Sequence, residues 1–324
     1  MKRIFLLSGE DLELAKAEVL ALADRSNKDC QMVDNVLILE ADFDFRRLAL
    51  TRKVYDYLFE SNYKDLDKTM EDFDWNSVYD KSFSLRITNV GNFAFHETEA
   101  RLARHIWKKV QSPRVDLDFS QTKIEVIVTE KKIFVARLNT ELKHEFHKRR
   151  PQTRPERHPT TINPKLARAM VNLTGVPVGK VIYDPFCGTG GILIEAGLMR
   201  FKTFGMDIDS DMLEKARKNL EYFKIKHFHL EQGDATKISN LVDYVVTDLP
   251  YGRSSKISHD LTDLYARFLT TLENILRYKA VIIFPNFFDH RALLKRTNFK
   301  VEKEFTWYVH KSLSRNIVLL SKKR

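Results

Sequence analysis

The stretch KVIYDPFCGTGGILIEAG, residues 180–197, indicates how the second half of the chain folds. A short β-prone run ends at Asp184, and three glycines precede a second apolar run. Because glycine lets the backbone turn tightly, the pattern predicts a strand, a turn and a helix that begins near Ile192. The spacing is neither G-x-G-x-x-G nor the Gly-Lys-Ser/Thr ending of a phosphate-binding loop. We therefore expect a nucleotide-type loop without a pyrophosphate cradle.

Four further β-prone runs follow this loop, with helical patterns between several of them. Strands that alternate with helices predict a mostly parallel sheet covered on both faces, with ligands at the carboxyl ends of its strands. Residues 299–310 and 315–322 read as two strands joined by a short turn, so we expect an antiparallel pair at the sheet edge. The four runs are residues 201–207, 227–234, 242–250 and 280–285.

Each strand end in this half carries a distinctive group. The second strand ends at Asp207, 23 residues after Asp184, close to the offset of about 20 residues at which an acidic side chain meets ribose hydroxyls. The third ends in Gly-Asp-Ala, where Asp234 is placed to accept a hydrogen bond from an adenine amino group. The fourth ends in TDLPYG, residues 247–252. Together these groups suit a nucleoside cofactor without phosphates.

The composition is that of an ordinary soluble protein, with 324 residues, 43% of them hydrophobic and 30% charged. This length predicts two or three folding units. No apolar run approaches the roughly 20 residues that span a bilayer, and the N-terminal residues lack a signal-peptide pattern, so we expect a cytoplasmic protein with no membrane partner. Two distant cysteines, Cys30 and Cys187, exclude a disulfide framework and a multi-cysteine zinc site.

The net charge of +10 is concentrated in residues 143–168, which carry eight Lys or Arg against two Glu. Prolines in this segment interrupt helix and strand, so we expect a basic connection between domains that also faces nucleic acid. Its histidines lack companion thiols and lie among cations, so we expect no structural metal and solvated or phosphate-facing rings. These histidines are His144, His147 and His158.

The order Asp-Pro-Phe-x-Gly-x-Gly, acidic strand end, Gly-Asp-Ala and Asp-x-Pro-Tyr resembles the Rossmann-type methyltransferases that modify exocyclic amino groups. The resemblance implies S-adenosyl-L-methionine as the cofactor. It places the methionine part at the glycine loop, the ribose at Asp207 and the adenine at Asp234. The implied cofactor-binding residues are Thr161, Asp184, Phe186, Gly188, Gly190, Asp207, Ile208, Asp234, Ala235 and Asp248.

TDLPYG then has a chemical interpretation. An amine conjugated to a base ring is a poor nucleophile, so the site must aim its lone pair at the methyl group. Asp248 and the carbonyl of Pro250 would accept hydrogen bonds from the amine, and Tyr251 would stack on the extruded base. Leu249 departs from the familiar Asp-Pro-Pro-Tyr form, and we expect the loop to tolerate it. Cysteine-dependent methylation of a ring carbon is not expected, because no cysteine lies near this motif.

The first half has no comparable catalytic signature. Residues 81–93, residues 97–110 and two later β-prone runs predict a strand, helix, strand, strand order. This half resembles the THUMP domain, an RNA-binding module of tRNA-modifying enzymes, preceded by a ferredoxin-like domain. We expect a ferredoxin-like domain at 1–60, a THUMP domain at 61–145, a basic linker at 146–164 and a methyltransferase domain at 165–324. Basic side chains available for RNA backbone contacts are Arg86, Arg101, Arg104, Lys108 and Lys109.

The whole chain is similar to the archaeal THUMP-domain tRNA (guanine-10-N2) methyltransferase family. This resemblance implies an α/β, Rossmann-type class I domain beside α+β domains, and transfer of one or two methyl groups to the N2 amine of a guanosine in tRNA, first of all at position 10. Position 6, ribosomal RNA guanine and a noncatalytic RNA-binding role stay open, whereas the THUMP-like half argues against DNA adenine methylation. We expect a monomer and leave open a small activating partner protein.

Overall fold

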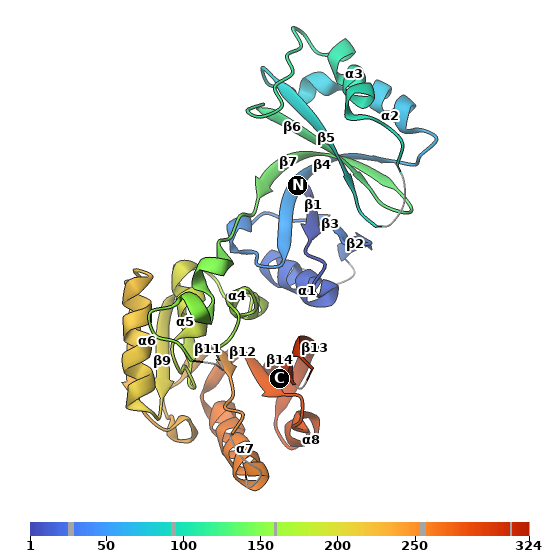
Figure 1. The fold of residues 1–324 in the computed structure, drawn as a ribbon. Coiled ribbons are helices and arrows are strands. Elements are labelled where there is room, and N and C mark those ends of the chain that lie inside the picture. The colour runs from blue at the N-terminus through green and yellow to red at the C-terminus, as the bar shows by residue number, and fades with distance from the viewer. Residues whose placement is uncertain (25–28, 92–94, 159–160, 253–256, 312, 324) are drawn as a thin grey trace. The chain divides into compact units, whose positions relative to one another are not determined.

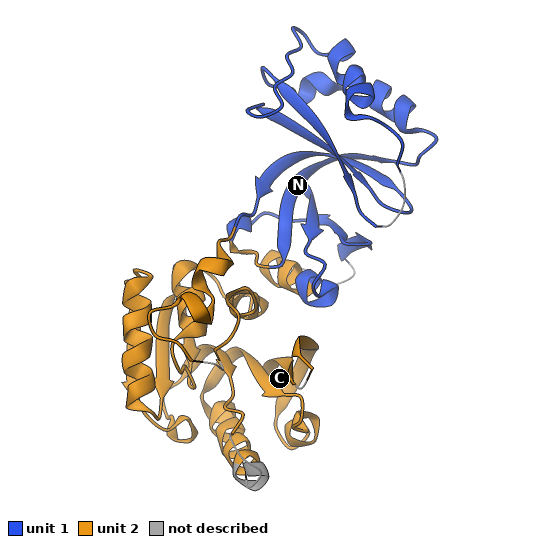
Figure 2. Cartoon of the chain, in the orientation of Figure 1, with its two compact units in different colours: residues 1–16, 25–46, 50–143 blue, residues 17–24, 47–49, 144–324 orange. Residues whose placement is uncertain are grey.

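The computed structural model describes residues 1–24, 29–91, 95–158, 161–252, 257–311 and 313–323 (Figure 1). The chain forms two compact units (Figure 2). Unit 1 comprises residues 1–16, 25–46 and 50–143, and unit 2 comprises residues 17–24, 47–49 and 144–324.

Unit 1 is built on one seven-stranded sheet in the order β2-β3-β1-β4-β7-β6-β5. The long strand β4 pairs antiparallel with β1 on one side and with β7 on the other. One sheet therefore continues through residue 60, where we expected the boundary between the ferredoxin-like and the THUMP domain. That boundary remains a prediction. The strands are β1 (Lys2–Leu7), β2 (Cys30–Val33), β3 (Val36–Glu40), β4 (Thr51–Ser61), β5 (Phe83–Asn89), β6 (Thr122–Val128) and β7 (Ile133–Glu141).

Two helices of unit 1, α2 (Leu66–Asp72) and α3 (Glu99–Lys109), share a hydrophobic cluster with β5, β6 and β7. The predicted order of strand, helix, strand, strand is confirmed by β5, α3, β6 and β7. Two of the five basic side chains expected to face RNA are engaged within the unit, because Arg86 pairs with Glu99 and Arg101 pairs with Asp67. The other three, Arg104, Lys108 and Lys109, are exposed.

Unit 2 carries a second seven-stranded sheet in the order β10-β9-β8-β11-β12-β14-β13. The first five strands in this order run parallel, and β14 pairs antiparallel with both β12 and β13. Both the parallel part and the antiparallel edge pair were predicted, and both are confirmed. The strands are β8 (Val181–Asp184), β9 (Lys202–Asp207), β10 (Phe228–Gln232), β11 (Val242–Asp248), β12 (Leu276–Pro285), β13 (Phe299–His310) and β14 (Leu313–Lys322).

The strand order reverses between β8 and β11, which is where a doubly wound sheet opens a crevice for ligands. Residues of α7 and α8 pack with β11, β12 and β14 in one hydrophobic cluster, while α5 and α6 contribute to another. The helices are α4 (Pro164–Leu173), α5 (Gly191–Leu198), α6 (Ser210–Tyr222), α7 (Ile257–Ile275) and α8 (His290–Leu294). Helix α1 (Leu12–Ala23) is divided between the units. No helix in the described ranges is both long enough and apolar enough to span a bilayer.

The segment expected to be a linker packs within unit 2. Glu195 on α5 is fully buried and accepts hydrogen bonds from Arg149, at 2.6 Å, and from Arg168, at 3.0 Å. Arg154 is 2% exposed, and burial lowers the pKa of its guanidinium to about 10. Three of the eight basic residues in 143–168 are therefore engaged inside the unit rather than presented to a partner.

The expectation of solvated or phosphate-facing rings is wrong for His144. Its Nε2 lies 2.7 Å from the carbonyl oxygen of Leu48. Burial, reinforced by the charge of Arg168, lowers the pKa of His144 to about 4. The ring is therefore neutral at physiological pH and does not serve as a cation for phosphate.

Replacing Glu195 with Gln should lower the free energy of unfolding of unit 2 by about 3–5 kcal/mol, because two buried guanidinium groups would lose their counter-charge. Chemical denaturation of the full chain measures this loss. Glu214→Gln is the control, since its exposed pair with Arg217 should contribute less than about 1 kcal/mol. Equal, small losses in the two variants would contradict the role given to Glu195.

Candidate active site

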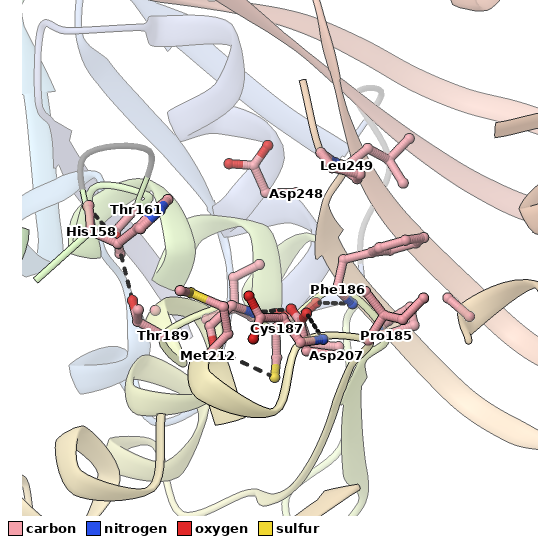
Figure 3. Close-up of a pocket in the computed structure, with 18 of the residues that line it drawn as sticks. His158, Thr161, Pro185, Phe186, Cys187, Thr189, Asp207, Met212, Asp248 and Leu249 are labelled. Atoms are coloured by element: carbon pink, nitrogen blue, oxygen red, sulfur yellow. Dashed lines mark hydrogen bonds between the residues drawn. The ribbon is translucent and has the colours of Figure 1, made fainter. Parts of the chain in front are cut away.

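A cavity of about 650 Å³ lies in unit 2 at the carboxyl ends of β8, β9, β10 and β11. Figure 3 shows Thr161, Phe186, Asp207 and Asp248 around it. Eleven of the twelve site residues predicted from the sequence line this cavity, so the four strand ends do meet at one place. These eleven are Thr161, Asp184, Phe186, Gly188, Asp207, Ile208, Asp234, Ala235, Asp248, Pro250 and Tyr251.

Gly190 is the predicted residue that does not line the cavity. Its φ is +81°, in the left-handed region, and it immediately precedes α5. A Cβ atom at this position would lie 3.4 Å from the Cβ of Ala216 on α6. Gly190 therefore makes the turn possible and lets α6 pack against it, while Gly188 and Gly191 lie at the cavity wall.

Two aspartates hold the glycine loop in place. Asp207 accepts hydrogen bonds from the backbone N–H of Gly188, at 2.8 Å, and of Asp209, at 3.0 Å. Asp184, which is 2% exposed, accepts one from the N–H of Phe186 and one from the hydroxyl of Thr247, at 2.7 Å. Burial raises the pKa of Asp184 to about 8. This carboxyl is therefore largely protonated near neutral pH. Its hydrogen bond with Thr247 joins the end of β8 to β11 in the interior of the unit.

The two outer parts of the cavity are also fixed by local contacts. Asp234 accepts hydrogen bonds from the backbone N–H of Thr236, at 2.9 Å, and from its hydroxyl, at 2.7 Å. These bonds hold the pKa of Asp234 below its usual value, so the side chain stays ionised. Elsewhere in the lining, the hydroxyl of Thr161 donates to the carbonyl of His158 and lies 3.2 Å from the hydroxyl of Thr189.

The TDLPYG segment makes contacts that the sequence did not reveal. Tyr251 donates a hydrogen bond of 2.7 Å from its hydroxyl to Asp248 Oδ1. Arg315 at the start of β14 places Nη2 3.1 Å from Asp248 Oδ2 and donates from Nε to the hydroxyl of Tyr251, at 2.9 Å. The carbonyl of Pro250 accepts a hydrogen bond of 2.6 Å from Tyr265 on α7.

Arg315 and Tyr265 were missed because each is an isolated residue in an ordinary apolar pattern. Burial raises the pKa of Asp248, while the charge of Arg315 and the hydrogen bond from Tyr251 lower it. The Pro250 carbonyl keeps a second lone pair for a further donor. The segment thus presents two oxygen acceptors in fixed positions at the cavity.

The chemistry of the lining fits S-adenosyl-L-methionine. Among the described lining residues, five are aspartates and none is lysine or arginine. Asp184 is buried and largely protonated, but the remaining acidic side chains make a wall that suits a molecule with a sulfonium and an ammonium charge. The cavity volume lies in the usual range for small-molecule sites. The five aspartates are Asp184, Asp207, Asp209, Asp234 and Asp248.

Two models of known families match parts of the chain. The model of a family described as RMKL-like, methyltransferase domain, matches residues 151–315, a range that contains the glycine loop and TDLPYG. A second model, described as DNA methylase, matches residues 38–218 and ends before TDLPYG. The first match thus covers the whole cavity described above.

Solved structures show the same fold over the full chain. TrmN from Thermus thermophilus superposes with a TM-score of 0.52 at 19% identity and covers 100% of both chains. A possible methylase from Clostridium difficile 630 gives a TM-score of 0.54 at 17% identity, and the match covers 100% of this chain and 98% of that one. At these identities the likeness establishes the fold alone, and the expected class I methyltransferase sheet is confirmed.

Curated relatives align with nearly the whole length of the chain. The tRNA (guanine(10)-N2)-dimethyltransferase of Methanothermobacter thermautotrophicus is 33% identical over 99% of this chain and 100% of its own length. The protein of the same name from Pyrococcus abyssi is 36% identical over 95% of this chain and 96% of its own. A tRNA (guanine(6)-N2)-methyltransferase of Archaeoglobus fulgidus is 26% identical over 58% of this chain and 56% of its own. The chain therefore belongs to the family of the archaeal tRNA (guanine(10)-N2)-dimethyltransferases.

Proposed function

We propose that the protein transfers one or two methyl groups from S-adenosyl-L-methionine to the exocyclic N2 amine of a guanosine in tRNA, at position 10. The observation that supports this proposal most directly is the acidic cavity, whose lining includes two acceptors, the carboxylate of Asp248 and the carbonyl of Pro250. The names of the full-length relatives support both the tRNA substrate and the amine that is modified.

Different residues of the cavity would bind different parts of the cofactor. Asp207 would receive the ribose hydroxyls, and the ionised Asp234 would accept a hydrogen bond from the adenine amino group. Phe186 and the backbone at Gly188 would border the methionine part. Bound in this way, the cofactor supplies a methyl group on a sulfonium sulfur, a good leaving group.

Asp248 and Pro250 would prepare the amine. If the carboxylate and the carbonyl each accept one N–H of the amine, its lone pair is directed away from the ring plane and toward the methyl group. With the cofactor held by the cavity residues and the amine held by Asp248 and Pro250, the amine nitrogen would receive the methyl group and would then release a proton to solvent. The carboxylate stabilises the positive charge that develops on nitrogen. Tyr251, held at the cavity edge, would stack on the base.

Basic side chains outside the cavity would contact the tRNA backbone. Exposed cations remain on α3, at Arg104, Lys108 and Lys109. Phosphate contacts orient a folded RNA without reading its sequence. Three of the basic residues in 143–168, namely Arg149, Arg154 and Arg168, are engaged inside unit 2. The other five are Lys143, Lys148, Arg150, Arg157 and Lys165. We also propose that the protein is a monomer in the cytoplasm. Whether it needs a small activating partner protein is left open.

The experiment that tests this function is methyl transfer from labelled S-adenosyl-L-methionine to an unmodified tRNA transcript, with the modified nucleoside identified and mapped. We expect N2-methylguanosine or its dimethyl form at position 10. The same nucleoside at position 6 would keep the chemistry and move the site, although the relative of that name matches a smaller part of the chain. Tight cofactor binding without transfer to tRNA would contradict the proposed substrate.

Asp207→Ala should weaken S-adenosyl-L-methionine binding by about 10-fold to 100-fold, because a charged acceptor for the Gly188 N–H and for the ribose would be lost. Isothermal titration calorimetry measures this loss, and tRNA affinity should change less than about threefold. Glu221→Ala, an exposed change on α6, should alter neither affinity. If Asp207→Ala weakened tRNA and cofactor equally, the effect would be misfolding rather than a lost cofactor contact.

A further inference from the structure

We propose that Arg315 is a positioning residue for methyl transfer, which holds the Asp248 carboxylate and the Tyr251 hydroxyl in the arrangement that receives the target amine. This inference rests on the proposed function of the same site. The motif TDLPYG does not include Arg315. This residue lies on β14, in the antiparallel part of the sheet.

The topology explains how Arg315 reaches the site. Strand β14 runs antiparallel to β12, and Arg315 is the register partner of Pro285, the last residue of β12. The beginning of β14 therefore lies at the carboxyl end of a parallel strand, on the edge of the sheet where ligands bind. The Arg315 side chain is 6% exposed, so its charge is withdrawn from water and directed to fixed partners.

Arg315, Asp248 and Tyr251 form a closed ring of contacts. Oδ1 of the carboxylate receives the Tyr251 hydroxyl at 2.7 Å, Oδ2 lies 3.1 Å from Nη2 of Arg315, and Nε of Arg315 donates to the same hydroxyl at 2.9 Å. Within the described part of the chain each carboxylate oxygen has one of these contacts, and a carboxylate oxygen has a second lone pair with which to accept a further hydrogen bond. The ring stops the carboxylate from rotating and leaves a lone pair for the amine.

The same contacts set the orientation of the aromatic ring. The guanidinium carbon lies 5.9 Å from the centroid of the Tyr251 ring. The ring of Phe287 meets Tyr251 edge to face, with centroids 6.5 Å apart. Tyr251 is therefore held both by its hydroxyl and along its ring, and a base that stacks on it would find a surface already in place.

Arg315 also opposes the effect of burial on Asp248. Among the residues that the structure describes, the titratable groups around Asp248 are Asp184 on β8, Tyr251 in the loop, Tyr265 on α7 and Arg315 on β14. Among them Arg315 is the cation. Burial raises the pKa of Asp248, and the charge of Arg315 is the largest influence that lowers it. Without Arg315 the pKa of Asp248 would rise further, and the carboxylate would become protonated at a higher pH.

Two substitutions test this role. Arg315→Met removes the charge and both donors, and Arg315→Lys keeps a charge that cannot occupy the Nε and Nη2 positions together. We expect kcat on tRNA to fall about 100-fold in the Met variant and about 10-fold in the Lys variant, since misplaced transition-state contacts have costs of this order. The affinity for S-adenosylhomocysteine should change less than about threefold. Arg291→Met is the control, because this side chain is 73% exposed and pairs with Glu304.

The pH dependence of kcat separates positioning from a merely structural role. Activity requires ionised Asp248, so kcat falls as the pH drops through the pKa of that group. Removing Arg315 raises this pKa, so the acid limb of the profile should move to higher pH and alkaline conditions should restore part of the activity. The Lys variant should show a smaller displacement.

The proposal is overturned if both variants keep the wild-type kcat and the wild-type acid limb. It is also overturned if kcat, cofactor affinity and melting temperature fall together in the Lys variant with an unmoved acid limb, because Arg315 would then be structural. If the Met variant does not fold, the Lys variant decides. Absence of methyl transfer by the wild-type protein would contradict the proposed function instead, and the two failures are therefore distinguishable.

Discussion

The site depends on one buried carboxyl, Asp184, which joins two motifs that lie far apart in the sequence. It accepts hydrogen bonds from the N–H of Phe186 and from the hydroxyl of Thr247, a fully buried residue. The first contact fixes the start of the glycine loop, and the second fixes the strand that ends at Asp248. Because β8 and β11 meet where the strand order reverses, this tie sets the distance between the glycine loop and the oxygen acceptors of Asp248 and Pro250.

The acidic side chains of the cavity and the exposed basic side chains occupy different parts of the chain's surface. Aspartates line the cavity, where a cationic methyl donor is expected, and exposed lysines and arginines lie outside it, where phosphates are expected. Arginines that are buried serve other purposes. Arg149 and Arg168 neutralise Glu195 inside unit 2, and Arg315 lies against Asp248. The net charge of the chain therefore overstates the basic surface that is available to RNA.

Local patterns predicted the parallel sheet and its strand ends, and the family resemblance that these motifs carry implied most of the cavity residues. The strand ends, the glycine turn and TDLPYG are short continuous motifs, and eleven of the predicted residues meet at one cavity. Contacts between distant residues were not predictable in this way. Arg315 lies 64 residues from Tyr251, and no periodic or motif signal distinguishes it from other arginines.

The basic segment shows the same limit of sequence patterns. Its prolines and charges are typical of a solvated connection. Arg149 and Arg168 are nevertheless held inside unit 2, because both donate hydrogen bonds to Glu195 on α5. Residues 17–24 and 47–49 also join unit 2. There the buried Glu18 accepts hydrogen bonds from the Asn172 side chain, at 2.7 Å, and from the N–H of Ala49, at 2.8 Å. Such pairings depend on the folded topology, which composition does not record.

The most direct test of the account compares two tRNA transcripts that differ by one amino group. One carries guanosine at the modified position and the other carries inosine, which lacks the N2 amine and keeps the rest of the base. With labelled S-adenosyl-L-methionine, we expect methyl transfer to the guanosine transcript and none to the inosine transcript at that position, although both should bind equally well. Equal transfer to the inosine transcript would place the methyl group on another atom and contradict the amine chemistry assigned to Asp248 and Pro250.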